Sequence, residues 1–310
     1  MMIFLLLLAL DAGFTQRIVV APRESLTVAV TRPTSSPADS AGAPIVLIPG
    51  LLGGSFGFRR LTPELAAAGH ATYIVEPLGT GTSSHPRGGD YSLDAQSDRV
   101  AAVLDSLGVT EAIVVGANFG ASVAMRLAYR RPELVAAVLS LDGGPVDRSS
   151  TGGATVAMRF APILKFFGAK GIARRRIGDA LREYSADSSW VTPEVVDAYS
   201  RPIVNDLGGA AAVLSDMRRA TVPARLAENL WRIRQPVRLL IGAANRHGGI
   251  EADETTLLRE RVPDIAVDSV EGSGVYLHEE RPEVVVTAVL ALADAARRAA
   301  MVPDAAATQR

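Results

Sequence analysis

The chain has 310 residues, 48% of them apolar, so it can bury a large core as one large domain or two modest ones. Its 32 basic and 33 acidic residues nearly balance, which leaves no net field for nucleic acid or another polyanion. The absence of cysteine excludes disulfides, thiolate nucleophiles and cysteine-ligated metals. The four histidines are not paired at the spacing of metal ligands, so we expect no metal or other cofactor.

Residues 1–16 begin with the apolar run MMIFLLLLAL, which ends before Asp11. The run is about half as long as the roughly 20 residues that a helix needs to span a bilayer. It is similar to the apolar region of a secretory signal but lacks the basic start of such signals. Export or membrane attachment is therefore as well supported as a mis-assigned start codon or a segment that packs against the domain or a partner. The compartment stays open.

Short apolar runs typical of buried strands recur along the chain. Two strands rich in β-branched residues lie within 17–32, and the polar stretch 33–42 that follows is expected to be a surface connection. Six further runs follow, at 44–50, 71–77, 111–118, 136–144, 237–245 and 265–274. Continuous apolar runs are what strands covered on both faces of a parallel sheet require.

Helical patterns separate most of these runs, at 62–69, 93–107, 121–129, 253–261 and 282–298. Alternating strands and helices predict an α/β fold with a mostly parallel sheet covered by helices on both faces. We expect this core to comprise residues 17–144 and 236–300, with a short C-terminal tail at 301–310.

One insertion breaks the alternation. Residues 145–235 contain no convincing strand but several helical stretches, at 157–167, 172–184, 192–203 and 209–220. A helical insertion of this length between two strands of one sheet is expected to cover the C-terminal edge of that sheet. We call residues 145–235 the lid.

The stretch VVGANFGAS, residues 114–122, carries the strongest motif. A predicted strand ends in Gly116-Ala117-Asn118-Phe119-Gly120 and leads directly into a helix. This context matches the G-x-S-x-G elbow, in which a strained turn lifts the central side chain above the sheet. Glycine is expected on both sides because the backbone crowds such a turn.

Three further motifs occur in the same order as in the α/β-hydrolase superfamily: IVLIPGLLGG, EPLGTGTSS and GSGVYLHEERPEVV. From about residue 20 to 298 the chain resembles the lidded branch that includes epoxide hydrolases, haloalkane dehalogenases and carbon-carbon bond hydrolases. The resemblance implies the α/β-hydrolase fold with a helical lid insertion. It also implies that the backbone N–H groups of Leu51 and Phe119 can form an oxyanion hole.

The same resemblance places Asn118 at the nucleophile position, Asn245 at the acid position and Val275 at the histidine position. These enzymes need a nucleophile, a histidine that moves its proton or activates water, and an acid that orients the histidine. A neutral amide cannot be activated as a serine is, an asparagine cannot balance an imidazolium, and valine has no proton chemistry. Three losses on three distant loops favour a catalytically inactive protein, a pseudoenzyme with a degenerate triad.

Three residues are candidate substitutes. His278 follows Val275 closely and is expected at the surface or at the start of the last helix. His247 is expected in an exposed loop, and Asp142 is expected to cap neighbouring backbone.

Three functions stay open. The leading hypothesis is a binding or accessory subunit that presents its lid or sheet edge to a protein partner, in a membrane-associated assembly if residues 1–16 dock there. The first alternative is a lidded hydrolase of esters, epoxides or carbon-carbon bonds with an unconventional set drawn from Asn118, Asp142, His247 and His278. The second alternative is a carrier or sensor that holds a small apolar ligand under the lid.

Overall fold

A central eight-stranded sheet organises the molecule, here described from a computed structural model for residues 13–33, 42–146, 169–221, 225–244 and 249–301. The strands are β1 (Phe14–Ala21), β2 (Glu24–Thr31), β3 (Ile45–Ile48), β4 (Thr72–Val75), β5 (Ala112–Ala117), β6 (Val135–Leu141), β7 (Val237–Gly242) and β8 (Ile265–Val270). Their order is β1-β2-β4-β3-β5-β6-β7-β8, with antiparallel pairing where β2 meets β1 and β4 and parallel pairing elsewhere. The predicted mostly parallel sheet is confirmed.

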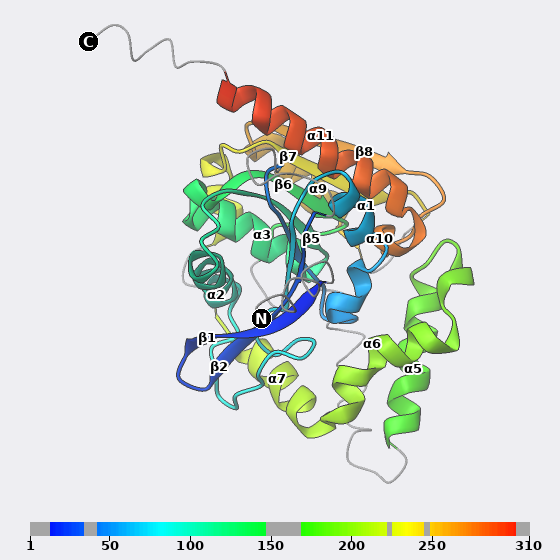
Figure 1. The fold of residues 1–310 in the computed structure, drawn as a ribbon. Coiled ribbons are helices and arrows are strands. Elements are labelled where there is room, and N and C mark those ends of the chain that lie inside the picture. The colour runs from blue at the N-terminus through cyan, green and yellow to red at the C-terminus, as the bar shows by residue number, and fades with distance from the viewer. Residues whose placement is uncertain (1–12, 34–41, 147–168, 222–224, 245–248, 302–310) are drawn as a thin grey trace, which may run out of the picture.

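Helices cover both faces of this sheet (Figure 1). On one face lie α2 (Leu93–Ser106), α3 (Phe119–Arg130) and α9 (Ala252–Arg261), and on the other lie α1 (Thr62–Ala67), α10 (Leu277–Glu280) and α11 (Pro282–Met301). Strand β5 is buried along its whole length: Val114 packs into the first core, and Ile113 and Val115 pack into the second. A strand covered on both faces requires such a continuous apolar run.

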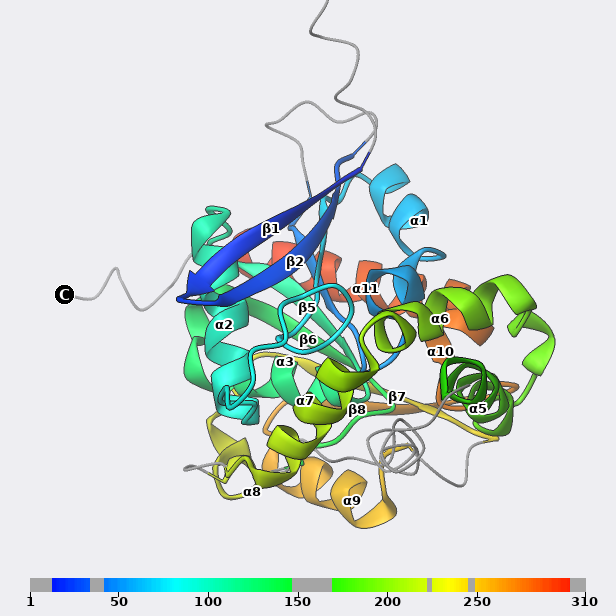
Figure 2. The ribbon, with the colours of Figure 1, turned by 90° about the horizontal axis from the view of Figure 1, so that it is seen from below.

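The described part of the lid is helical and has a small core of its own. It comprises α5 (Ala169–Glu183), α6 (Pro193–Asn205), α7 (Leu207–Arg219) and α8 (Leu226–Asn229). Figure 2, seen from below, shows α7 in front of the sheet and α5 and α6 to its right. Apolar residues of α5 and α6, among them Leu181, Val196 and Tyr199, pack together. The predicted helical stretch 157–167 lies outside the described residues.

The described residues also contain the short 3-10 helices η2 (Gly54–Phe58), η3 (Pro132–Leu134), η5 (Ser188–Trp190) and η6 (Leu230–Arg232). Helix α6 packs against η2, which follows β3. The lid therefore meets the core at the loop where the resemblance predicts the oxyanion hole.

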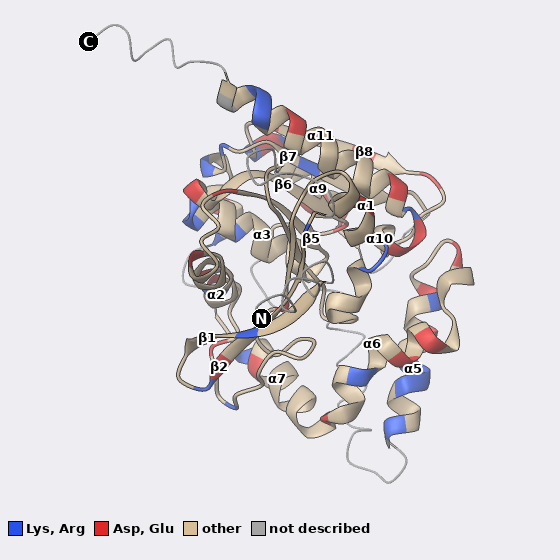
Figure 3. Ribbon diagram, viewed as in Figure 1, with Lys and Arg blue, Asp and Glu red and all other residues tan. Residues whose placement is uncertain are grey.

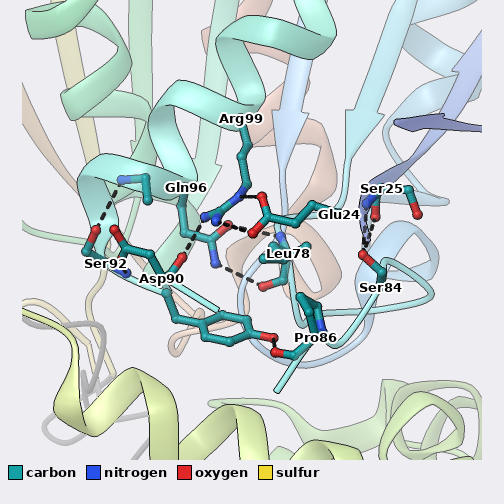
Figure 4. A network of polar contacts seen from close by, with 11 residues as sticks. Glu24, Ser25, Leu78, Ser84, Pro86, Asp90, Ser92, Gln96 and Arg99 are labelled. Carbon is teal, nitrogen blue, oxygen red and sulfur yellow. Dashed lines mark hydrogen bonds and ion pairs between the residues drawn. The ribbon is translucent and has the colours of Figure 1, made fainter. Parts of the chain in front are cut away.

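Polar contacts hold the loop after β4 against α2 (Figure 4). The Gln96 side chain accepts from the N–H of Leu78 and donates to the Leu78 carbonyl, at 2.9 Å in each case. Arg99 forms two hydrogen bonds with the Glu24 carboxylate, at 2.7 and 2.8 Å. These contacts join strand β2, the loop and helix α2, which keeps the loop in one position relative to the sheet.

Many charged residues of both signs lie on the outer helices, although a few, such as Arg126 and Glu279, are buried. Figure 3 shows Lys and Arg together with Asp and Glu on the outer helices, with both signs on α5. Arg174 and Asp197, for example, pair at 3.0 Å between two lid helices. No helix among the described residues has the length and apolar character needed to cross a bilayer.

Candidate functional site

The turn at Asn118 has the strained geometry that the motif predicts. Asn118 sits between β5 and α3 with φ 47° and ψ −108°, and its N–H donates to the Leu141 carbonyl at 2.9 Å. A Cβ on Gly120 would stand 2.1 Å from the Ile48 carbonyl oxygen, and one on Gly116 would stand 2.4 Å from the Ala121 Cα. Only glycine fits at both positions, so the backbone of the elbow requires glycine there.

The Asn118 side chain is held by one hydrogen bond. Its Nδ2 donates to the Asp142 carbonyl at 3.3 Å, and because a carbonyl can only accept, this contact assigns the orientation of the amide. Its Oδ1 lies 3.5 Å from the point where a Cβ on Gly50 would stand. Asn118 therefore offers a hydrogen-bond acceptor beside the loop that follows β3, and no nucleophile.

Val275 lies in a loop that is fixed from several sides. The residue is 6% exposed, and its N–H donates to the Tyr184 carbonyl at 3.0 Å. The Glu280 carboxylate accepts from the N–H groups of Gly274 at 2.7 Å and Ala186 at 2.6 Å. These hydrogen bonds fix the loop in which the resemblance predicts a histidine. At that position the loop carries Val275, an apolar side chain that lines the cavity.

Asn118 and Val275 line the same cavity. Its volume is about 50 Å³, and it is lined by Pro49, Gly50, Leu51, Leu52, Gly54, Gly57, Phe58, Asn118, Phe119, Tyr184, Val275, Tyr276 and His278. None of these described lining residues carries a charged side chain near neutral pH, because the one ionisable group with an ordinary pKa close to 7, His278, is neutral there. A water needs about 10–15 Å³ measured in this way, so the cavity has room for a few heavy atoms. The site suits a small molecule.

Leu51 and Phe119, predicted to supply the oxyanion hole, both line this cavity. Phe119 is the first residue of α3, so its N–H has no acceptor within the helix. Within the described chain, neither N–H donates to another residue. Both N–H groups are therefore available to donate, and the oxyanion hole that the resemblance implies at Leu51 and Phe119 stays a prediction.

Asp142 bonds to backbone. Its Oδ1 accepts from the Ile250 N–H at 2.9 Å and its Oδ2 accepts from the Gly242 N–H at 3.4 Å. Both oxygens hold the ends of the loop after β7, which is the capping role that the sequence predicts. Asn245 and His247 lie outside the described residues, so the hypotheses about them remain predictions.

His278 is where the sequence-based expectation needs correction. The residue does lie at the start of a helix, in α10, but it is 6% exposed and lines the cavity, so a surface position is wrong. Its ring centroid lies 5.3 Å from that of Phe58 and 6.2 Å from that of Tyr276. Burial, aided by the nearby Arg59 charge, lowers the pKa of His278 to about 3. The imidazole is therefore neutral near neutral pH.

Sequence reasoning missed a buried polar cluster beside the cavity. Glu279 is fully buried, and its Oε1 accepts from the Tyr199 hydroxyl of the lid at 2.7 Å and from Arg59 Nη1 at 2.5 Å. The Tyr199 ring lies against Gly53, where a Cβ would come within 2.6 Å of it. Burial raises the pKa of Glu279, against the opposing effects of Arg59 and Tyr199. The cluster fastens the lid to the core.

The comparisons with known proteins agree with this architecture. A family model described as the alpha/beta hydrolase fold matches residues 43–169. The chain is similar to 2-(acetamidomethylene)succinate hydrolase of Mesorhizobium japonicum, with 26% identity over 87% of this chain and 95% of that protein. It is also similar to epoxide hydrolase B of Mycobacterium tuberculosis, with 35% identity over 34% of this chain and 30% of that protein. The chain spans 41% of the length of the first curated relatives it matches.

Solved structures show the same fold. The epoxide hydrolase CorEH superposes with a TM-score of 0.71 at 19% identity, covering 91% of this chain and 98% of that chain. Similarities to epoxide hydrolases and to meta-cleavage product hydrolases place the chain near the lidded branch of the fold.

Gly120→Ala should lower the free energy of unfolding by about 3 kcal/mol, because the added methyl group would collide with backbone of β3. The measurement is the denaturant midpoint, with Gly171→Ala as control. Nothing lies within 4 Å of the Cβ position at Gly171, so that change in a helix should leave stability unchanged or raise it by up to about 1 kcal/mol. Equal effects of the two substitutions would contradict the described elbow.

His278 should make the fold sensitive to acid. Its pKa falls from an ordinary 6.5 to about 3 on folding. Between these two pH values the unfolded chain therefore binds a proton at His278 that the folded chain does not bind. The free energy of unfolding is then lost as pH falls from 6.5 towards 3. Relative to the wild type, His278→Gln should gain roughly 1.4 kcal/mol of stability per pH unit between about pH 6 and 4.

Denaturant titrations at several pH values measure this difference, and NMR of the imidazole measures the pKa of His278 directly. A titration midpoint above pH 5 would show that the imidazole is not buried as described.

Proposed function

We propose that this chain, which belongs to the α/β-hydrolase fold family, binds a small and mainly apolar molecule beneath its lid without the family's nucleophilic turnover. The observation that carries the proposal is the cavity itself. It lies at the elbow, and its described lining holds no charged side chain. The lining includes Asn118 and Val275, which the resemblance places at the nucleophile and histidine positions. A largely apolar cavity with a few convergent polar groups is the usual form of a small-molecule site.

The groups around the cavity support binding better than turnover. The nitrogen lone pair of the Asn118 amide is delocalised and cannot be activated for attack, and its N–H donates to the Asp142 carbonyl. The Asp142 side chain is engaged by backbone N–H groups. A histidine with a pKa of about 3 is a poor general base at neutral pH, because efficient proton transfer needs a pKa near the working pH.

A hydrolase that uses a non-standard set drawn from Asn118, Asp142, His247 and His278 is the second candidate. It is favoured by the place of His278 in the cavity and by relatives that are named as hydrolases. An accessory subunit that binds a protein partner, with membrane association through residues 1–16, remains a prediction. Its sequence basis lies mostly in residues 1–12, which are outside the described part of the chain.

A turnover assay separates the first two candidates. With 4-nitrophenyl acetate and styrene oxide as probes, we expect the wild-type rate to equal that of the Asn118→Ala variant, because neither protein has a nucleophile at the elbow. A wild-type rate well above background, abolished by His278→Ala or His247→Ala, would favour the hydrolase instead.

Xenon tests the cavity directly, because an apolar cavity of this kind can take up the gas. Under xenon pressure we expect shifts in the methyl NMR signals of Leu51, Leu52 and Val275. Val275→Phe should fill the space and abolish the shifts of the two leucines. Val19→Phe is the matched control, since Val19 is 74% exposed on β1, and it should leave them unchanged. The absence of shifts in the wild type would contradict the proposed site.

A further inference from the structure

The two ring nitrogens of His278 have different surroundings. Nδ1 is sealed from solvent and has no hydrogen-bond partner among the described residues. Nε2 lies 3.5 Å from the point where a Cβ on Gly57 would stand, and Gly57 lines the cavity. Of the two nitrogens, only Nδ1 is both sealed and unbonded, so Nε2 is the one that remains open to the cavity.

This asymmetry assigns the tautomer. A neutral imidazole carries one N–H and one bare nitrogen. Orphaned buried N–H groups are rarer in proteins than under-satisfied acceptors, so the sealed Nδ1 is the bare nitrogen. Nε2 then carries the hydrogen and offers it to whatever fills the cavity.

The charges around the cavity exclude an ionic occupant. The nearest guanidinium, that of Arg59, donates to the Glu279 carboxylate and to the Phe56 carbonyl, so its charge is already balanced. The N-terminus of α3 supplies roughly half a unit of positive charge at most. A carboxylate buried here would lack a full counter-charge, and a cation would face several N–H donors.

Resting on the proposed function, the geometry points to His278 as the residue that selects the ligand, with its Nε2–H donating to the carbonyl oxygen of a small uncharged amide. The Leu51 and Phe119 N–H groups offer further donors for such a molecule. Asn118 Oδ1 is the complementary acceptor, placed to receive the amide N–H. An amide carries both an acceptor and a donor, and it brings no charge into the cavity.

Two isosteric probes test this assignment: isobutyramide and isobutyrate, titrated at pH 7 into the full-length protein. Binding is followed by the methyl signals of Leu51 and Leu52 and by the ring ¹⁵N signals of His278. We expect isobutyramide to bind at least tenfold more tightly than isobutyrate. The Nε2 signal should shift as its hydrogen bond forms.

Two variants test the role of the imidazole. His278→Phe keeps an aromatic ring but no donor, and should weaken isobutyramide about tenfold while xenon still binds, because one hydrogen bond is lost. His278→Gln keeps an uncharged N–H donor of similar reach and should restore most of the affinity. Retained xenon binding and wild-type methyl spectra show that the variants are folded.

Equal or tighter binding of isobutyrate would overturn the inference, and so would an unchanged isobutyramide affinity in His278→Phe. In both cases, xenon binding by the wild type would still support the proposed small-molecule site. Failure of xenon to bind the wild type would remove the proposed function and this inference with it.

Discussion

The rest of the site depends on the close approach of α3 to β3 at the elbow. The Gly120 backbone passes so near to the Ile48 carbonyl that no side chain fits between them, and Asn118 takes a positive φ to make the turn. Such a conformation costs about 1–3 kcal/mol and persists only where the surroundings over-determine it. Here it fixes the start of α3, where Phe119 lines the cavity. The strained scaffold is present although the residue at its centre is not a nucleophile.

A second constraint fastens the lid to the core beside the cavity. Tyr199 reaches from α6 across Gly53 to the Glu279 carboxylate, which Arg59 also binds. This cluster draws α10 under the lid, so that the neighbouring His278 is buried against Phe58. The burial that lowers the pKa of the imidazole is therefore a consequence of how the lid is fastened.

Local sequence patterns predicted the parallel sheet, the two helical layers and the elbow, because each depends on the periodicity of apolar residues or on glycines close to the turn. They could not predict the burial of His278. Its neighbours Glu279 and Glu280 suggest a solvated helix start, but Arg59 and Tyr199 balance the first acid, and backbone N–H groups of Gly274 and Ala186 bind the second. Arg59, Tyr199 and Ala186 are distant in the chain, so no local pattern reveals them.

Fold alone does not decide function, and the side chains that line the cavity set its charge as well as its reactivity. A buried ionisable group carries a desolvation penalty, which an active enzyme balances with a partner charge. Asn118 and Val275 bring no ionisable group to the cavity, and His278 stays neutral near neutral pH. A cavity lined without charge is poorly suited to stabilise an ionic intermediate. This property supports the proposed binding of a neutral molecule.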